Sequence, residues 1–258
     1  MNPETRTPPA WLRIIERLPR MIIYEDSKLL VLNKPAGVPS IPLSSEETGT
    51  AVHSALAHFP GLRNIGRGGL EPGILHRLDT GTSGLLVFAK TNEYFDFLQQ
   101  HWKTDRVRKW YRAICSPKQK DGSISPPDPL PPGEISFPLG HSAKSSKKMI
   151  CIHNAAALRQ IRGKALAAKT LIQEVKVIDE QARRLDLFIE IRTGVMHQIR
   201  CHLASVNWPI DGDLIYKGRL ADRLWLHAWR IELPLLPTAH KREARLLLEA
   251  RLPLSWPV

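Results

Sequence analysis

One short stretch of the chain combines residue types that could do covalent chemistry: His76-Arg77-Leu-Asp79-Thr-Gly81-Thr-Ser-Gly84. Asp79 follows a cation by two residues and precedes a glycine-rich turn, at the start of an apolar run. An aspartate held by hydrogen-bond donors at such a turn can act as a nucleophile or a base. The simpler alternative is a loop aspartate that caps its own turn, with glycines that adopt positive φ. Spacing alone favours this alternative.

A second stretch of interest is Arg192-Thr-Gly-Val-Met-His197-Gln-Ile-Arg200. If the residues from His197 onward are helical, Arg200 lies one turn further along, and its guanidinium could hold a carboxylate in a bidentate pair. A zinc site formed by His197, Cys201 and His202 is disfavoured, because zinc sites usually draw paired ligands from two segments. The segment alone favours a plain surface arginine on a solvated helix.

Cations and aromatic rings alternate in Arg106-Val-Arg108-Lys109-Trp-Tyr111-Arg112. Such a run could contact phosphates while a ring stacks on a base. It could equally be a basic edge strand whose Trp110 or Tyr111 packs in the core, and both interpretations stay open. A further basic segment, Lys144-Ser-Ser-Lys147-Lys148, is predicted to be a loop.

The charge of the chain indicates a polyanionic partner. Its 258 residues include 37 Lys and Arg against 25 Asp and Glu, a net charge of +12. Such a surplus favours binding to phosphates but does not distinguish RNA from DNA or from an acidic membrane. The isolated cysteines Cys115, Cys151 and Cys201 are expected to be reduced and mostly buried. Without a secretory signal or an apolar run of membrane length, we expect a cytoplasmic protein.

The elements that must position these residues follow from apolar patterning and turn residues. They predict an α+β fold on a mixed, mainly antiparallel sheet. Residues 1–20 form an N-terminal extension, and residues 21–258 are expected to form one domain without an internal boundary. Strands are expected within 21–35 around a turn at 25–28, and at 85–89, 170–177, 185–191, 224–231 and 244–252; helices at 48–58, 92–104 and 197–205; and an exposed loop at 116–133.

Taken together and in this order, these segments resemble the RluA family of pseudouridine synthases. The resemblance extends from about Ile22 to about Leu235, and its most specific part is the H-R-L-D-x-x-T-S-G block followed downstream by H-Q-I-R. It rests on Tyr24-Glu-Asp, Leu30-Val-Leu-Asn-Lys-Pro-Ala-Gly37, His76-Arg-Leu-Asp-Thr-Gly-Thr-Ser-Gly-Leu-Leu86, Lys109-Trp-Tyr-Arg-Ala113, Arg192-Thr-Gly, His197-Gln-Ile-Arg-Cys-His-Leu-Ala204, Pro209-Ile-Asp-Gly-Asp213, Tyr216 and Leu226-His-Ala228.

The resemblance implies roles for individual residues. Asp79 would be the catalytic carboxylate, Tyr111 the aromatic ring that packs on the target base, and Arg200 the partner that holds Asp79 ionised and oriented. Arg77 would help to pry open the RNA. The full set expected to contact RNA is His76, Arg77, Arg106, Arg108, Lys109, Lys144, Lys147, Lys148, Arg192 and His197.

The implied fold is the pseudouridine synthase fold, with helices and loops around a central basic cleft. The implied reaction breaks the N1–C1′ bond of a uridine, turns the uracil and rejoins it through C5. No redox change or group transfer occurs, so neither a cofactor nor a metal is expected. Asp79 would either attack C1′ or take part in a route through a glycal. The expected substrate is structured RNA, an rRNA or tRNA stem-loop, and the chain is expected to act as a monomer.

Two departures from the family pattern bear on substrate choice and packing. Val195-Met196 stands where Arg-Thr is usual, and Asn207-Trp208 replaces a frequent Gly-His. No accessory RNA-binding domain is expected before Tyr24. Two other functions stay open: a non-catalytic RNA-binding or ribosome-assembly factor on the same fold, and a metal-dependent nuclease built around Asp79, Asp211, Asp213 and the histidines.

Overall fold

The computed structural model describes residues 21–102, 104–117, 130–131, 133–237 and 244–257. The chain divides into two compact units, Met1–Gln100 and His101–Val258. No change of composition in the sequence predicts this division. The expected single domain over residues 21–258 stays a prediction.

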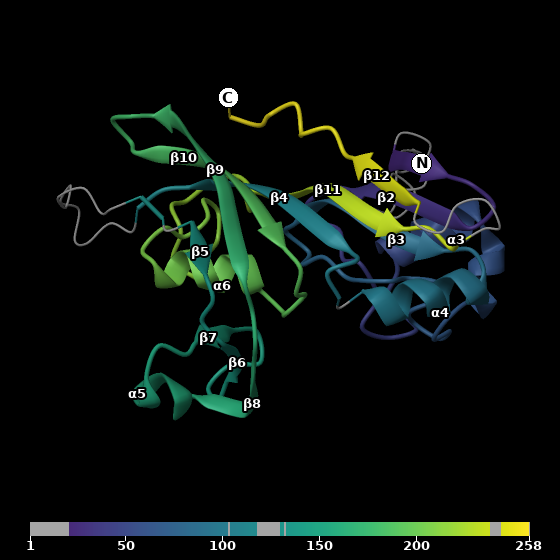
Figure 1. The fold of residues 1–258 in the computed structure, drawn as a ribbon, viewed down its shortest axis with the longest axis horizontal. Helices are drawn as coiled ribbons and strands as arrows, with labels where there is room; N and C mark the ends of the chain where they lie inside the picture. The colour runs from purple at the N-terminus through teal and green to yellow at the C-terminus, as the bar shows by residue number, and fades with distance from the viewer. Residues whose placement is uncertain (1–20, 103, 118–129, 132, 238–243, 258) are drawn as a thin grey trace, which may run out of the picture. The chain divides into compact units, whose positions relative to one another are not determined.

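The first unit contains three antiparallel strands in the order β1 (Ile22–Glu25), β2 (Leu29–Lys34) and β3 (Ser83–Ala89). Every residue of β3 is buried, and the first four residues of β2 are fully buried. Strands covered on both faces are typically continuous apolar runs of this kind. The helices of the unit are α3 (Ala51–His58) and α4 (Asn92–His101), with a 3-10 turn η1 (Pro60–Asn64) between them (Figure 1).

The second unit contains a long antiparallel sheet, in which β4 lies between β10 and β11. The order is β11-β4-β10-β9-β5, and β12 pairs with β11. The strands are β4 (Arg108–Cys115), β5 (Glu134–Ile135), β9 (Thr170–Asp179), β10 (Arg184–Ile191), β11 (Leu226–Pro234) and β12 (Arg245–Glu249).

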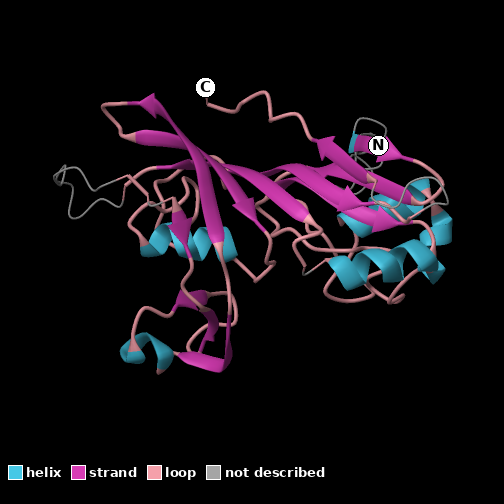
Figure 2. Cartoon of the chain, viewed as in Figure 1, coloured by secondary structure: helices cyan, strands magenta, loops and turns pink. Residues whose placement is uncertain are grey.

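A smaller sheet in the same unit has the order β7 (Met149–Cys151), β6 (Leu139–Ser142) and β8 (Ile161–Leu166), with the short helix α5 (Ala155–Leu158) beside it (Figure 2). Helix α6 (Gln198–Ser205) links the two sheets. His202 of α6 bonds to Thr170 of β9, and Cys201 bonds to Met149 of β7. The helix therefore joins the small sheet to the long one.

The predicted α+β fold with mainly antiparallel sheets is confirmed. The expected strands and helices are present to within a few residues, and the segment 144–148 is a loop between β6 and β7. Strands β5 to β8 and helix α5 were not predicted. Most of the expected loop 116–133 lies outside the described residues. Within the described part of the chain, no helix is long and apolar enough to cross a membrane.

Candidate functional site

Asp79 lies in the loop that leads into strand β3 from a preceding segment that pairs with that strand. Before this loop, the chain pairs with β3 through hydrogen bonds from Leu75 N to Val87 O at 3.0 Å and from Ala89 N to Gly73 O at 2.8 Å. The loop closes with a turn in which Thr82 N donates to Asp79 O at 3.0 Å. Asp79 is half-buried. The carboxylate therefore sits on a tight loop whose two ends are both fixed to one strand.

Ser40 fixes the residue before Asp79. Its Oγ accepts from Leu78 N at 2.9 Å and donates to Leu78 O at 2.7 Å. Ser40 and Leu78 are both buried, so these bonds are protected from water. A hydroxyl can donate and accept at once, and here it satisfies both polar groups of one residue.

Lys34 and Gly37 fix the residue after Asp79. Gly37 N donates to Thr80 O at 2.8 Å. The ammonium of Lys34, a fully buried residue, donates to the same carbonyl at 3.2 Å and to Val38 O at 2.6 Å. The backbone on both sides of Asp79 is thus anchored by the segment 34–40. We call Lys34, Gly37 and Ser40 the loop anchor.

His76 and Arg77 differ in their surroundings. Val87 N donates to His76 Nε2 at 3.2 Å, which places the proton of a neutral imidazole on Nδ1. Arg77 is 64% exposed and reaches Glu71 at 3.4 Å. His76 thus contributes to the fixed base of the loop, while Arg77 presents its guanidinium to solvent.

Strand β4 carries Tyr111 and Lys109 on one face, two residues apart. Both are buried, and Tyr111 pairs in register with Ile189 of β10 and Ala228 of β11. Burial lowers the pKa of Lys109 to about 8. The Lys109 ammonium lies 3.5 Å from the carbonyl oxygen of Arg192. Lys109 therefore contacts the backbone that follows β10.

The other face of β4 carries Arg108 and Arg112, each paired with a buried carboxylate. Arg108 Nε and Nη2 donate to Glu190 at 3.0 and 3.2 Å. Arg112 Nε donates to Asp186 Oδ1 at 2.9 Å, and its Nη2 contacts the other oxygen. β4 is an interior strand, so the edge-strand alternative is wrong, although burial of its aromatic rings is confirmed. Arg106 precedes the strand and is exposed.

Arg192 lies just beyond β10 and is more exposed. Its guanidinium contacts Glu190 at 3.1 Å and Asp105 at 3.4 Å. The pKa of Arg192 is raised, chiefly by the hydrogen bond to Glu190, and the pKa of Glu190 is lowered by its two arginine partners against the opposing effect of burial. Glu190 therefore organises a network of two arginines at the end of β10.

Arg200 lies on α6 and is buried, so the alternative of a surface arginine is wrong. Its Nε and Nη2 donate to the two oxygens of the fully buried Asp213 at 2.7 and 2.9 Å. Asp213 Oδ1 also accepts from the backbone nitrogens of Ile215 and Tyr216. The sequence left a bidentate pair open for Arg200, and Asp213 supplies its carboxylate within this unit. The expected role of Arg200 toward Asp79 stays a prediction.

His197 is the residue before α6 and has a left-handed backbone with φ +53. Its Nδ1 lies 3.3 Å from the hydroxyl of Tyr216, which accepts from Met149 N at 2.9 Å. Burial raises the pKa of Tyr216, so its hydroxyl stays protonated. Tyr216 thus connects the start of α6 with strand β7.

The residues considered for metal binding have other partners. His202 Nδ1 bonds to Thr170 Oγ1 and Nε2 to Phe137 O, at 2.8 and 2.9 Å. Asp211 pairs with Arg184 at 2.9 Å. The described residues contain no group of three or more His, Cys, Asp or Glu side chains arranged to hold a metal ion. This geometry gives no support to the zinc site or the nuclease.

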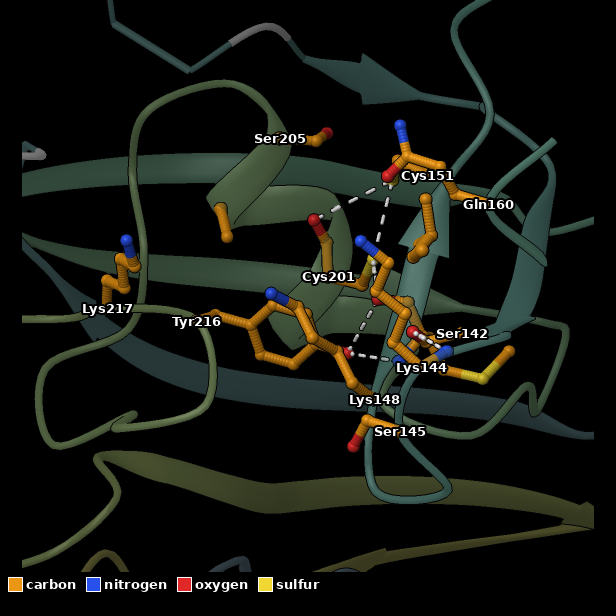
Figure 3. A pocket seen from close by; sticks show the side chains of 13 residues that line it. Ser142, Lys144, Ser145, Lys148, Cys151, Gln160, Cys201, Ser205, Tyr216 and Lys217 are labelled. Atoms are coloured by element: carbon orange, nitrogen blue, oxygen red, sulfur yellow. Dashed lines mark hydrogen bonds between the residues drawn. The ribbon is translucent and has the colours of Figure 1, made fainter. Parts of the chain in front are cut away.

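The basic loop 144–148 borders an open pocket of about 510 Å³ (Figure 3). Lys144 and Lys147 are exposed, and the ammonium of Lys148 lies 5.7 Å from the ring centre of Tyr216. The sides of the pocket are formed by this loop, strand β7, helix α6 and residues Tyr216 and Lys217. The pocket can accept an anionic group, because three lysines line it.

The sequence does not reveal the roles of two residues that shape the site, Ser40 and Lys34. Ser40 lies 38 residues from its partner Leu78, so no local pattern marks it. Lys34 was noted within a family motif, and its carbonyl partners were not foreseen. Asp79 belongs to the first unit, whereas Tyr111 and Arg200 belong to the second. The roles assigned to these three residues, and to the expected RNA-contacting residues, stay predictions.

Comparison with known proteins places these features in a family. A sequence profile described as RNA pseudouridylate synthase matches residues 28–205. The chain is 30% identical over 198 residues to "Ribosomal large subunit pseudouridine synthase D" of Pseudomonas aeruginosa, covering 77% of this chain and 53% of that protein. A protein of the same name from Nitrosomonas europaea is 30% identical over 251 residues, covering 92% and 63%. The chain thus spans less than two thirds of the length of these relatives.

A solved structure shares the fold. "Human RNA Pseudouridylate Synthase Domain Containing 4" aligns with a TM-score of 0.62 and 24% identity, covering 94% of this chain and 92% of that one. At this identity the likeness concerns the fold alone.

Proposed function

The chain belongs to the RNA pseudouridylate synthase family, and on that premise we propose that it isomerises uridine to pseudouridine in structured RNA. In this reaction the N1–C1′ bond breaks, the uracil turns, and a C5–C1′ bond forms. C5 loses its proton, and N1 gains one. All atoms of the nucleoside are retained. The protein must therefore hold a carboxylate in place, stabilise a detached base and keep the RNA in position.

Asp79 is our candidate for the catalytic carboxylate. The observation that carries the proposal is the loop anchor, which fixes the backbone of both neighbours of Asp79. A reacting group gains from such fixation, because an error of about 1 Å in its position can cost roughly 100-fold in rate. Whether the Asp79 carboxylate attacks C1′ or assists a glycal route is left open by this arrangement.

The substrate we propose is an rRNA, as the printed names of the relatives indicate for those proteins. The target uridine must leave its stack at a cost of a few kcal/mol. Exposed cations can offset part of this cost by binding phosphates. Arg77, Arg106, Lys144 and Lys147 are exposed and suited to that task. We expect Tyr111 to pack on the base, and the chain to act as a cytoplasmic monomer.

The test is pseudouridine mapping of total RNA by chemical labelling and sequencing. Cells that carry the gene would be compared with cells that lack it and with cells that carry only Asp79→Asn. Asp96→Asn is a matched control, since Asp96 is an exposed aspartate on α4 in the same unit. We expect one or a few sites to disappear without the gene and with Asp79→Asn, and to persist with Asp96→Asn.

The same experiment distinguishes the proposed isomerase from the alternative function, a non-catalytic RNA-binding or ribosome-assembly factor. If the maps are identical with and without the gene, and the purified protein binds RNA but leaves it unmodified, that candidate takes its place. If Asp79→Asn retains every modification, the family activity stands but the role of Asp79 is wrong.

A further inference from the structure

Two thiols from distant parts of the second unit lie side by side. Cys151 ends strand β7 and Cys201 lies on α6, 50 residues further along the chain. Their sulfur atoms are 3.7 Å apart, and the single S–H of Cys201 has two acceptors within reach, Cys151 Sγ and Met149 O. Cys151 Sγ in turn donates to the carbonyl oxygen of Cys201 at 3.7 Å. Both thiols are free, so the pair is a reduced dithiol.

The dithiol borders the pocket described above. Figure 3 shows Cys151 and Cys201 together in its wall, and Lys144, Lys148 and Lys217 line the same pocket. Cys151 and Cys201 are only 7% and 4% exposed, but both line this pocket, so a small solute that enters it lies next to them. The two cysteines are therefore placed where a thiol-reactive molecule can meet them.

The two sulfur atoms differ in acidity. The hydrogen bond from Cys201 lowers the pKa of Cys151, and a further hydrogen bond with Ser205 acts in the same direction against burial. The same thiol–thiol bond, followed by burial, raises the pKa of Cys201. Cys151 is thus the thiolate-forming partner, and Cys201 is the thiol held next to it. A reactive dithiol requires this division, with one sulfur that attacks and one that resolves.

Cys115 provides an internal contrast. It lies on β4 with no exposed surface, and burial raises its pKa well above the ordinary value, as do the neighbouring carboxylates. It has the features of an inert buried thiol.

We propose that Cys151 and Cys201 are a redox modification site that forms a reversible disulfide when the protein meets a peroxide. The Cys151 thiolate attacks one peroxide oxygen, and the O–O bond breaks. The other oxygen leaves as hydroxide and takes up a proton to become water, and Cys151 becomes a sulfenic acid. The Cys201 sulfur then attacks Cys151 Sγ, the S–S bond forms, and water leaves with the sulfenic oxygen. Overall, two thiols lose two protons and two electrons, and the peroxide is reduced to two waters. A dithiol reductant reverses the reaction.

The required movement is small. Bonded sulfur atoms lie about 2.0 Å apart, so the pair must close by roughly 1.7 Å from its present distance. The bond would tie β7 to α6 next to Arg200 and at the base of the basic loop 144–148. Oxidation would therefore restrict two segments that, on the proposed function, serve the RNA site.

The experiment uses the purified full chain, reduced, desalted without oxygen and treated with a small excess of hydrogen peroxide. Free thiols are then alkylated and the digest is analysed by mass spectrometry. We expect a Cys151–Cys201 cross-linked peptide, a mass lower by two hydrogens, and recovery of both thiols with dithiothreitol. Cys115→Ser is the matched control and should form the same link. Cys151→Ser and Cys201→Ser should not form it.

A second probe tests the pair without oxidation. Phenylarsine oxide bridges two neighbouring thiols, so it should bind the wild-type protein and Cys115→Ser one to one and bind neither of the other variants. The proposal is overturned if peroxide leaves both thiols alkylatable, or converts them separately to sulfinic acids without a link. Neither readout depends on pseudouridine formation, so failure of this proposal is distinct from failure of the proposed function.

Discussion

Two regions of the molecule position a charged residue in different ways: the loop that carries Asp79, and the ion pair between Arg200 and Asp213. The loop anchor acts on the backbone of Leu78 and Thr80 and uses carbonyl and amide groups. At Arg200, a buried carboxylate binds the guanidinium directly at 2.7 and 2.9 Å. The first set of hydrogen bonds fixes the backbone on either side of Asp79. The second set binds the side chain of Arg200 directly. A group that must react is suited to the first kind of support, and a group that must stay fixed is suited to the second.

The largest effect on stability should follow from breaking the ion pair. In Asp213→Ala, the buried Arg200 loses its bidentate partner, and we expect the free energy of unfolding to fall by about 3 to 5 kcal/mol. Urea unfolding followed by circular dichroism measures this change. Glu249→Gln is the control, because the Arg230–Glu249 pair has a 46% exposed carboxylate and should contribute less than about 1 kcal/mol. Equal losses in the two variants would contradict the view that the buried Arg200–Asp213 pair contributes more to stability than an exposed pair.

A buried cation without such a carboxylate should behave in the opposite way. Among the described residues, no salt bridge reaches Lys109. Burial lowers the pKa of Lys109 to about 8 in the folded protein. In an unfolded chain the pKa of a lysine is about 10.4. Between these values the unfolded state binds more protons, so this group makes stability rise with pH there. We expect Lys109→Met to raise stability at pH 7 by up to about 3 kcal/mol.

The measurement is urea unfolding of the wild type and Lys109→Met from pH 7 to pH 10. The difference between the two proteins should shrink as the pH rises through 8. A difference that is constant over this range would show that the ammonium of Lys109 is not disfavoured by folding.

The loop anchor should show a smaller effect on stability and a larger one on turnover. Ser40→Ala leaves both polar groups of Leu78 without the hydroxyl, at a cost of about 1 to 3 kcal/mol. We expect turnover on RNA to fall about 10-fold or more beyond any loss of folded protein, because Asp79 is less well placed. Ser54→Ala, at a buried serine with a bond of 3.4 Å to Thr50, is the control and should leave turnover unchanged. Equal turnover in Ser40→Ala and Ser54→Ala would show that the loop anchor does not affect catalysis.

Sequence reasoning recovered those parts of the fold that depend on apolar patterning. The buried run of β3 and the alternation in β10 are local signals, and both strands are present. Strand β8 was missed because five of its six residues are exposed, so it carries no apolar pattern. Strand β5 has two residues, which is too short for any periodicity.

The sequence predicts those parts of the site that neighbouring residues in the chain define. The block around Asp79 and the helix that carries Arg200 could be found from neighbouring residues and a family likeness. The partners could not, because Ser40 and Leu78 are 38 residues apart and Cys151 and Cys201 are 50 residues apart. Asp213 was noted within a family motif, and only the folded chain shows that its carboxylate binds Arg200.

The central claim is that the carboxylate of Asp79 performs the chemistry while the anchor merely places it. Single-turnover conversion of uridine in an RNA that the wild-type protein modifies tests this claim most directly, with Asp79→Asn compared with Asp96→Asn. We expect a rate lower by at least ~1,000-fold in Asp79→Asn, with unchanged RNA affinity and unfolding free energy. A rate for Asp79→Asn within a few-fold of the control would contradict it.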